Sequence, residues 1–355
     1  MRFIKFFLVI VATIILSLSL SACAPKGSVV TFSFFNTIIR IETHGSILDK
    51  NTEQKLRDTF SSLQTQFDIN SNDSLIKNFN DAAVGTEFSL SNDATEIFAA
   101  AKECYVLSNK KFNPAIYPLV KLWGFSPFIF TSDFTPPNAD EISSVKANCN
   151  FDGAEFFGLN KTLKKTADIK LDFGGIVKGY AADKATKILN DAGHKKGYVS
   201  VGGSSISLLM SQTLSLTHPR KNGEIIKINT NGKYNLSVST SGDYEKYYLD
   251  KDGNRYCHLI DPDSGSPATT GIMSATILGT NGVYGDAFST AICLKNYNGN
   301  GNCELLTFID LIKTRFPKAE FYIILSDNDG GKILTNKVQG VDFTLLDSDF
   351  TVCNI

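Results

Sequence analysis

The order of strand-like and helix-like segments in the middle of the chain limits the folds it can adopt. Two helices are predicted there, over about residues 177–192 and 285–295. Strands that follow one another in runs, instead of alternating strictly with helices, favour an α+β fold over a doubly wound parallel sheet. The predicted strands cover residues 169–173, 197–201, 205–209, 225–230, 234–239, 255–260 and 273–278.

The flanking parts of the chain add further elements to this α+β domain. Residues 31–43 alternate and are rich in Phe, Ile and Thr, which predicts a strand. Apolar residues at spacings of four, three and four predict a helix over 51–67, and a second helix is predicted over 93–108 with Asp93 as its N-cap. A polar loop at 296–302 precedes a last helix near 304–315 and a final strand at 321–325. No internal repeat or domain linker is evident.

The N-terminus carries the pattern of a secretion signal. Arg2 and Lys5 precede an apolar run over 6–20, which is shorter than the roughly 20 residues of a membrane span. The run closes with Leu-Ser-Ala-Cys, which resembles a bacterial lipobox and makes Cys23 the expected lipidated residue. Ordinary cleavage with Cys23 as a free thiol is the alternative. The predicted organisation is a lipoprotein signal peptide over 1–22, a tether over 23–30 and a catalytic domain over 31–355, held by its lipid at the extracytoplasmic face of the cell membrane.

Charge and cysteine usage exclude some classes of function. The 355 residues include 35 basic and 36 acidic side chains, a net charge of −1, and no basic run with interleaved aromatic residues, so nucleic-acid binding is not expected. Apart from Cys23, six cysteines are scattered without the spacing of a zinc site, and they fit either disulfides or buried free thiols.

The segment Asp172-Phe173-Gly174-Gly175-Ile176-Val177-Lys178-Gly179 reads as a strand, a glycine turn and the start of a helix. Glycines let the backbone approach a ligand closely, and a helix N-terminus offers unpaired N–H groups to an anion. The lysine in the turn adds a positive charge. The spacing matches neither a P-loop nor a dinucleotide fingerprint. A phosphorylated ligand and a plain strand-to-helix connection are both consistent with this pattern.

Two later motifs carry candidate chemistry. His258 precedes an Asp-Pro and Ser-Gly turn, where it can accept a proton near neutral pH, with Asp261 close enough to influence its orientation. A structural histidine bonded to the backbone is the alternative. Asp286 and Thr290 are four residues apart, so on a helix both oxygens point to one spot, which suits a hard cation such as Mg²⁺. Here the alternative is that Asp286 caps the helix and Thr290 is an ordinary interior residue.

Taken together and in this order, the motifs resemble those of the FAD:protein FMN transferase (ApbE) family. Its members carry segments like Asp-Leu-Gly-Gly-Ile-Ala-Lys-Gly-Tyr, Ser-Gly-Asp-Tyr, His-x-Ile-Asp-Pro-x-x-Gly and Ala-Asp-Ala-x-x-Thr-Ala, and many are lipoproteins. The resemblance covers roughly residues 34–294 and implies a single ApbE-like, T-fold-related domain. Further matching segments are Ser241-Gly242-Asp243-Tyr244, Phe112-Asn113-Pro114 and Pro118-Leu119-Val120-Lys121-Leu122-Trp123-Gly124-Phe125.

The resemblance implies a reaction and a set of site residues. Family members bind FAD and, with Mg²⁺, transfer its FMN half to a threonine of a partner flavoprotein, such as a subunit of a membrane electron-transfer complex, and release AMP. His258 is the candidate general base and Asp286 the candidate catalytic metal ligand. The metal ligands implied are Gly175 and Val283 through their carbonyls, and Asp286 and Thr290 through their side chains. The FAD-binding residues implied are Phe35, Asn70, Lys111, Phe112, Asn113, Asp172, Lys178 and His258.

The chain departs from the family pattern at three positions. Asn70 stands where many members have a tyrosine, Asn113 replaces an aspartate, and Ser204 follows a glycine pair where an aspartate is usual. Loss of a stacking ring weakens ligand contact by about 1 kcal/mol. These changes favour looser FAD retention or attack by water. Two alternatives to the transferase therefore remain: an FAD pyrophosphatase that gives FMN and AMP, and a lipoprotein that binds FAD without turnover.

Overall fold

The computed structural model describes residues 27–131, 133–297, 303–327 and 330–355. The predicted signal peptide, the lipidation site Cys23 and the first half of the predicted tether lie outside the described residues, as does most of the predicted loop at 296–302. The last three tether residues belong to strand β1. No helix of the described residues is long and apolar enough to span a membrane.

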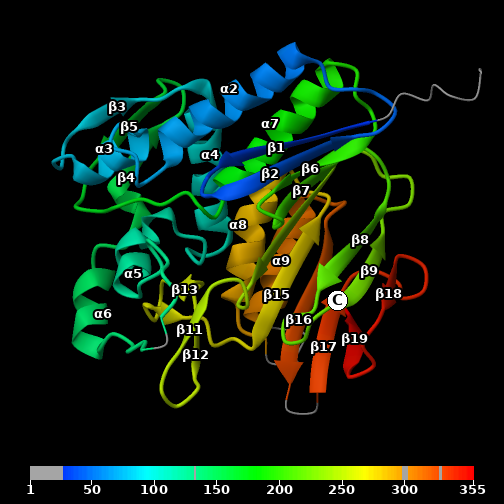
Figure 1. The fold of residues 1–355 in the computed structure, drawn as a ribbon. Helices are drawn as coiled ribbons and strands as arrows, with labels where there is room; N and C mark the ends of the chain where they lie inside the picture. Colours follow the sequence, from blue (N-terminus) through cyan, green and yellow to red (C-terminus); the bar gives the residue numbers. More distant parts are fainter. Residues whose placement is uncertain (1–26, 132, 298–302, 328–329) are drawn as a thin grey trace, which may run out of the picture.

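A nine-stranded mixed sheet organises the molecule (Figure 1). Its neighbouring strands are antiparallel except for the last pair, which is parallel. In spatial order the strands are β1 (Ser28–Phe34), β2 (Thr37–Thr43), β6 (Gly197–Val201), β7 (Ser205–Leu208), β10 (Leu236–Gly242), β15 (Ile272–Leu278), β16 (Glu320–Asp327), β17 (Gly330–Thr335) and β19 (Phe350–Asn354). This sheet with its helices confirms the predicted α+β class.

Helices cover one face of this sheet in two layers (Figure 1). The first layer contains α7 (Val177–Asp191), which packs on β6 and β7, and α8 (Gly282–Cys293), which packs on β10 and β15. Outside them lie α2 (Lys50–Phe67), against α7, and α4 (Asn92–Leu107), against α8. The fully buried apolar side chains between these layers form the larger core. The remaining helices are α3 (Leu75–Asp81), α5 (Tyr117–Leu122), α6 (Ala139–Lys146) and α9 (Glu304–Arg315).

Four small sheets surround the large one. A three-stranded sheet of β8 (Thr213–Thr217), β9 (Glu224–Asn229) and β18 (Phe343–Leu345) contributes to a second apolar core with strands of the large sheet. The strands β3 (Glu87–Ser89), β4 (Ala154–Phe157) and β5 (Thr162–Lys165) form another sheet. Two hairpins complete the set: β11 (Tyr247–Leu249) with β12 (Arg255–Cys257), and β13 (Ile260–Asp261) with β14 (Ser266–Pro267).

Several predicted element boundaries were wrong for identifiable reasons. The strand expected over 31–43 is two strands, because Phe35 and Asn36 both adopt φ of +55° and turn the chain back. Ser91, not Asp93, caps α4 by accepting a hydrogen bond from the Ala94 amide. The strand expected over 255–260 is broken before His258, and strands β17, β18 and β19 follow the one predicted to be last.

The segment before the glycine turn is extended but is not a strand. The side chain of Asn80 accepts a hydrogen bond from the Leu171 amide at 2.6 Å and donates to the Leu171 carbonyl at 2.9 Å. The next amide, that of Asp172, donates to the Pro114 carbonyl. Because these partners satisfy the backbone groups that a ladder would use, the segment runs between elements outside any sheet.

The two inner helices cross at a pair of glycines. A Cβ on Gly179 of α7 would lie 2.1 Å from the Gly282 carbonyl oxygen, and one on Gly282 would lie 2.6 Å from the Gly179 carbonyl oxygen. Each helix also supplies a carboxylate to the N-terminus of the other. Asp286 of α8 accepts from the Gly179 amide at 2.7 Å, and Asp183 of α7 accepts weakly from the Val283 amide at 3.4 Å. Neither helix has a side-chain cap from its own N-cap residue, so these contacts replace caps.

We predict that Gly179→Ala destabilises the protein strongly, because the added methyl group would overlap the backbone of α8. The free energy of unfolding should fall by about 3 kcal/mol, measured by urea denaturation. Gly45→Ala is the matched control: that glycine has φ of +74° but nothing within 4 Å of its Cβ position. It should cost only the conformational strain of about 1–2 kcal/mol. Equal losses in the two variants would contradict a steric crossing.

Candidate functional site

Asp286 is the central buried acid of the candidate site. It lies in the second turn of α8, where its side chain faces the sheet and is 7% exposed. Its Oδ1 accepts from Ser239 Oγ at 2.7 Å and from Ser205 Oγ at 2.8 Å, and its Oδ2 accepts from the Gly179 amide. Asp286 therefore does not cap its own helix, but it caps α7 across the crossing.

The carboxylate of Asp286 keeps room for a cation. Two carboxylate oxygens offer about four acceptor positions. Ser205 Oγ lies within 2.9 Å of both oxygens but has a single proton to donate. With Ser239 Oγ and the Gly179 amide it makes three protein donors for the four acceptor positions. One acceptor position is left for a monodentate ligand bond. Burial raises the pKa of Asp286, while the charge of Lys178 and the hydroxyl donors act to lower it.

Thr290 and Gly175 lie beside this carboxylate. Thr290 follows Asp286 by one turn of α8, and its Oγ1 lies 3.9 Å from the Cβ position of Gly175 in the glycine turn. Ser241 Oγ on β10 lies 3.1 Å from Thr290 Oγ1. The described residues contain no group of three or more His, Cys, Asp or Glu side chains that would hold a metal. One carboxylate with a hydroxyl and a carbonyl fits Mg²⁺, which keeps several waters and takes other oxygens from a substrate.

Val283, the fourth predicted metal ligand, lies in the first turn of α8. Its buried side chain joins the large core, and its amide faces Asp183. The structure thus brings Asp286, Thr290 and Gly175 together, while no contact of Val283 with this group is recorded. Its role as a carbonyl ligand stays a prediction.

Lys178 and Asp172 flank the glycine turn as predicted. Lys178 lies in the first turn of α7, where its Nζ donates to Ser204 Oγ at 3.0 Å. Asp172 is half-buried, and its Oδ1 accepts from the Gly174 amide at 2.7 Å, which fixes the turn. Burial raises the pKa of Asp172, although that amide and the charge of Lys246 oppose the shift. The side chain of Ser204, at a position where an acid is usual in the family, therefore anchors the lysine.

His258 faces the same cluster from the segment between β12 and β13. Its Nδ1 lies 3.3 Å from the Lys246 carbonyl, which assigns the proton to Nδ1 and leaves Nε2 as an acceptor. Burial and the charges of Lys246 and Lys178 lower the pKa of His258 to about 4, so the ring is neutral near pH 7. Asp261 does not orient the ring as expected, because its Oδ1 binds Lys111 Nζ at 2.7 Å.

The three residues at 111–113 have different surroundings. Phe112 lies against the glycine turn, with its ring 3.4 Å from the Cβ position of Gly175. Lys111 is 6% exposed and pairs with Asp261 and Asp263, and these hydrogen bonds outweigh burial and raise its pKa. The Asn113 side chain accepts from the Ala115 amide and donates to the Cys149 carbonyl. Both polar groups of Asn113 thus hold the local backbone, although it was predicted as a ligand contact.

Phe35 and Asn70 lie in the turn between β1 and β2 and just after α2. The Phe35 amide donates to Gln64 Oε1 at 2.7 Å, so the turn between β1 and β2 is held against α2. Asn70 is exposed just after α2, and its amide donates to Asp68. The last ring of α2, Phe67, packs on Phe173 at 5.3 Å between centroids, so this end of the helix lies beside the glycine turn.

Sequence reasoning missed the residues that hold the site together. Ser205 and Ser239 face each other across β7 and β10 and both donate to Asp286. Ser241 lies two residues further on the same face of β10, where it contacts Thr290. Lys246 supplies the carbonyl for His258 and the charge near Asp172. The alternating serines of β10 were a usable signal, since small polar residues on the buried face of a strand require partners.

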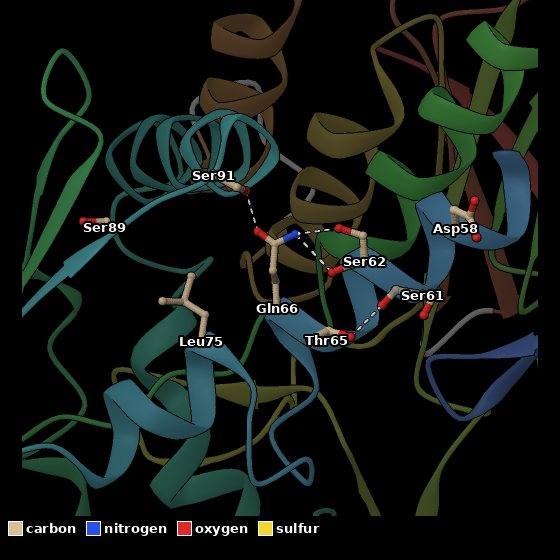
Figure 2. Close-up of a pocket in the computed structure, with 8 residues that line it drawn as sticks. All are labelled: Asp58, Ser61, Ser62, Thr65, Gln66, Leu75, Ser89 and Ser91. Carbon is tan, nitrogen blue, oxygen red and sulfur yellow. Dashed lines mark hydrogen bonds between the residues drawn. The ribbon is translucent and has the colours of Figure 1, made fainter.

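A hollow on the surface of the described residues lies elsewhere. It measures about 580 Å³ and lies on the outer face of α2 beside α3 and β3, where Gln66 links Ser62 to Ser91 (Figure 2). None of the predicted site residues lines it. The lining residues are Asp58, Ser61, Ser62, Thr65, Gln66, Leu75, Ser89 and Ser91. This hollow is therefore separate from the candidate site.

The cysteines of the described residues are all free thiols, and all but Cys353 are buried. The spacing of the cysteines fitted either disulfides or free thiols, and the structure shows free thiols. Burial raises the pKa of Cys257, next to His258, to about 11, so this thiol stays protonated at neutral pH.

Comparison with known proteins gives a consistent result. The model of the ApbE family matches residues 30–302 of the chain. An FAD:protein FMN transferase from Klebsiella pneumoniae is 29% identical over 233 residues, which are 62% of this chain and 64% of the relative. An FAD:protein FMN transferase from Treponema pallidum is 25% identical over 332 residues, which cover 86% of this chain and 88% of that protein.

Solved structures share the fold. The flavin transferase ApbE from Vibrio cholerae superposes with a TM-score of 0.74 at 20% identity, covering 87% of this chain and 97% of that one. The ApbE protein from Thermotoga maritima gives a TM-score of 0.71 at 23% identity, over 84% and 94% of the two chains. At these identities the likeness establishes the fold of the domain.

We predict that the His258 imidazole titrates with a midpoint near pH 4, measured by NMR of the ring. Lys246→Met should move the midpoint toward 6.5, because one of the opposing charges is lost. Between pH 6.5 and 4 the unfolded chain binds more protons at this residue, so folding stability should fall as the pH drops through that window. His258→Gln, as the control, should lose this part of the pH dependence. A midpoint near 6.5 in the unmodified protein would contradict the buried environment.

Proposed function

Because the chain belongs to the ApbE family, we propose that it is a Mg²⁺-dependent FAD:protein FMN transferase. It would attach FMN from FAD to a threonine of a partner flavoprotein and release AMP. The observation that carries this proposal is the convergence of Asp286, Thr290 and Gly175 beside Lys178 and His258. The family's curated relatives bear the same activity in their names.

The reaction is an in-line displacement at the FMN phosphorus. The threonine oxygen of the acceptor forms the new P–O bond, and the bond from that phosphorus to the bridging oxygen breaks, so that the pyrophosphate is divided and AMP leaves. Asp286, Thr290 and the Gly175 carbonyl would hold Mg²⁺, which neutralises charge on the pyrophosphate. Lys178 adds a point charge, held toward the turn by Ser204.

His258 is the proposed general base. With Nδ1 directed at the Lys246 carbonyl, Nε2 can accept the proton of the attacking hydroxyl. The nearby charges of Lys246 and Lys178 keep the free ring neutral, which leaves it ready as an acceptor at neutral pH. A pKa of about 4 makes a weak base, and an anionic ligand between these groups would raise it by offsetting the two ammonium charges.

The flavin nucleotide would lie along the remaining predicted residues. Phe112, against Gly175, offers a ring beside the glycine turn, and Phe35 offers another from the β1–β2 turn. Lys111 is already paired with Asp261 and Asp263, so any contact with FAD would rearrange two ion pairs. We propose that Asp172 contributes mainly by fixing the turn through the Gly174 amide.

We further propose that the protein acts at the extracytoplasmic face of a membrane, attached through a lipid on Cys23. The support is the charged start, the short apolar run and the Leu-Ser-Ala-Cys ending of the N-terminus. The acceptor would then be an extracytoplasmic flavoprotein, or such a domain of a membrane electron-transfer complex. Two lipid chains suffice for stable anchoring.

Hydrolysis is the competing activity that one observation favours. Asn70 is exposed just after α2, at a position where many members of the family carry a tyrosine. Without that ring, water has easier access to the same phosphorus. The products would be FMN and AMP, with no modified acceptor.

We predict that AMP release from FAD and Mg²⁺ depends on an acceptor protein. With FAD and Mg²⁺, the purified protein should release AMP only when an acceptor protein is present, measured by chromatography. The acceptor should gain the mass of FMN less one water, measured by mass spectrometry. AMP without an acceptor would mean a pyrophosphatase. Bound flavin without AMP would mean a binding protein. Asn70→Tyr should lower any acceptor-independent AMP release.

We predict that Asp286→Asn lowers kcat by about 100-fold or more, because the metal loses its charged ligand. His258→Gln should lower kcat by about 10²–10⁴-fold, because it removes the proposed proton acceptor. Asp58→Asn, an exposed acid on the outer face of α2, is the matched control and should leave activity unchanged. Near-normal turnover in His258→Gln together with loss in Asp286→Asn would place the base elsewhere.

A further inference from the structure

A second polar pocket lies on the other side of the helix crossing from the Thr290 end of α8. Its volume is about 280 Å³, and every lining side chain is polar. It is built from α7, from β7 and β10, and from the turn that begins α8. The lining residues are Asp183, Thr186, Lys187, Asn190, Ser207, Asn235, Ser237, Thr280 and Asn281. None of them is a predicted FAD or metal contact.

This pocket is a pseudo-symmetric counterpart of the Asp286 site. Gly179 and Gly282 meet at the crossing, and each is followed four residues later by an aspartate. Asp286 faces the serine pair of β7 and β10 described above. Asp183 accepts from Ser237 Oγ at 2.8 Å.

The strand register shows how the two acids are related. Ser237 of β10 pairs with Ser207 of β7, two residues before the Ser239–Ser205 pair that supports Asp286. Because side chains two residues apart on a strand lie on the same face, both serine pairs face the helices. The same face of the sheet thus supports two carboxylates, one at each side of the crossing. A short Gly-x-x-x-Asp pattern, at 179–183 and at 282–286, produces this arrangement, and the sequence alone did not single it out.

Two buried hydroxyl groups in the pocket have no partner. Thr186 is 6% exposed and Thr280 is 7% exposed, and the Oγ1 atom of each makes no hydrogen bond within the described residues. A buried polar atom without a partner costs free energy, so native structures fill such positions with water or an ion. Both residues line the pocket, which has room for an occupant.

The charges of the pocket decide the class of occupant. Asp183 is the one carboxylate of the lining, and the exposed Lys187 is paired with Asp191. The other lining groups are neutral hydroxyls and amides, which offer oxygen ligands to a hard cation. The N-terminus of α8 also points its positive end at Asp183, which opposes a doubly charged ion. We propose that this pocket binds an alkali-metal cation, with Asp183, Thr186 and Thr280 among its ligands.

Such a cation would support the catalytic side of the crossing. A Cβ built on Gly285 would lie 2.7 Å from Ser239 Oγ and 3.0 Å from Thr280 Oγ1. Both hydroxyls therefore pack against the same residue of α8. Ser239 also donates to Asp286. Fixing Thr280 would therefore fix the turn of α8 that carries Asp286. The binding itself does not depend on the proposed transferase reaction.

Thermal unfolding of the full chain in detergent tests this proposal without FAD. With EDTA present and ionic strength held constant, KCl or NaCl should raise the midpoint by about 3 °C relative to choline chloride. The double variant T186V/T280V should lose this rise while keeping the midpoint in choline chloride, because the two hydroxyls bind no protein group. Tyr322→Phe is the matched control: it removes another buried hydroxyl without a partner, outside the pocket, and should keep the full rise.

Three results would overturn the proposal. They are no rise with either alkali ion, a rise that survives in T186V/T280V, and a rise produced only when a calcium salt, added without EDTA, replaces the alkali salts. A crystal soaked in a thallium(I) salt gives an independent measurement, since an anomalous peak should lie beside Asp183. If the double variant fails to fold, that peak decides the question, and a pocket holding only water would contradict the proposal.

Discussion

The close crossing of α7 and α8 is the contact on which the rest of the structure depends. Two glycines let the backbones touch, and two carboxylates reach across to the opposite helix N-terminus. Uncapped N-terminal amides usually need a local partner or water. Here each helix provides the partner of the other, so the position of α7 cannot change without moving Asp286. The glycine turn, Lys178 and the proposed metal ligands are thereby held as one unit.

The sheet contributes the second half of this arrangement. Serines of β7 and β10 face the helices and donate to the buried acids, which lets a carboxylate stay beneath α8 without an ammonium partner in contact. Neutral donors stabilise a buried charge less than an ion pair does, and they leave its remaining acceptor positions accessible. A carboxylate locked in a salt bridge would be a poor ligand. The serine support therefore suits an acid that has to bind a cation.

Local patterns predicted the fold class and which residues share a helix face or a turn, but not the distant partners of those residues. Asp286 and Thr290 share one helix face because the helical period dictates it, and Lys178 follows a glycine turn whatever surrounds it. The partners of these residues come from distant segments: Gly179 lies over a hundred positions before Asp286, and Ser205 and Ser239 lie on two different strands. Residues 169–173 were predicted to form a strand because their side chains suit one. The Asn80 side chain instead hydrogen-bonds to the amide and carbonyl of Leu171, which a neighbouring strand would otherwise use. Such tertiary partners cannot be read from one local sequence window.

The charge balance of the site explains why a pyrophosphate would enter together with a metal. Glu245 interacts electrostatically with both Lys178 and Asp286, so Asp172, Glu245 and Asp286 are three carboxyl groups set against the two ammonium groups of Lys178 and Lys246. His258 adds no charge near neutral pH. A dinucleotide pyrophosphate brings about two further negative charges into partly buried surroundings, where repulsion is stronger than in water. Two lysines do not offset that excess, whereas the proposed divalent cation at Asp286 would offset it. The same excess makes the free site a poor place for an anion alone, so binding of nucleotide and metal should be mutually dependent.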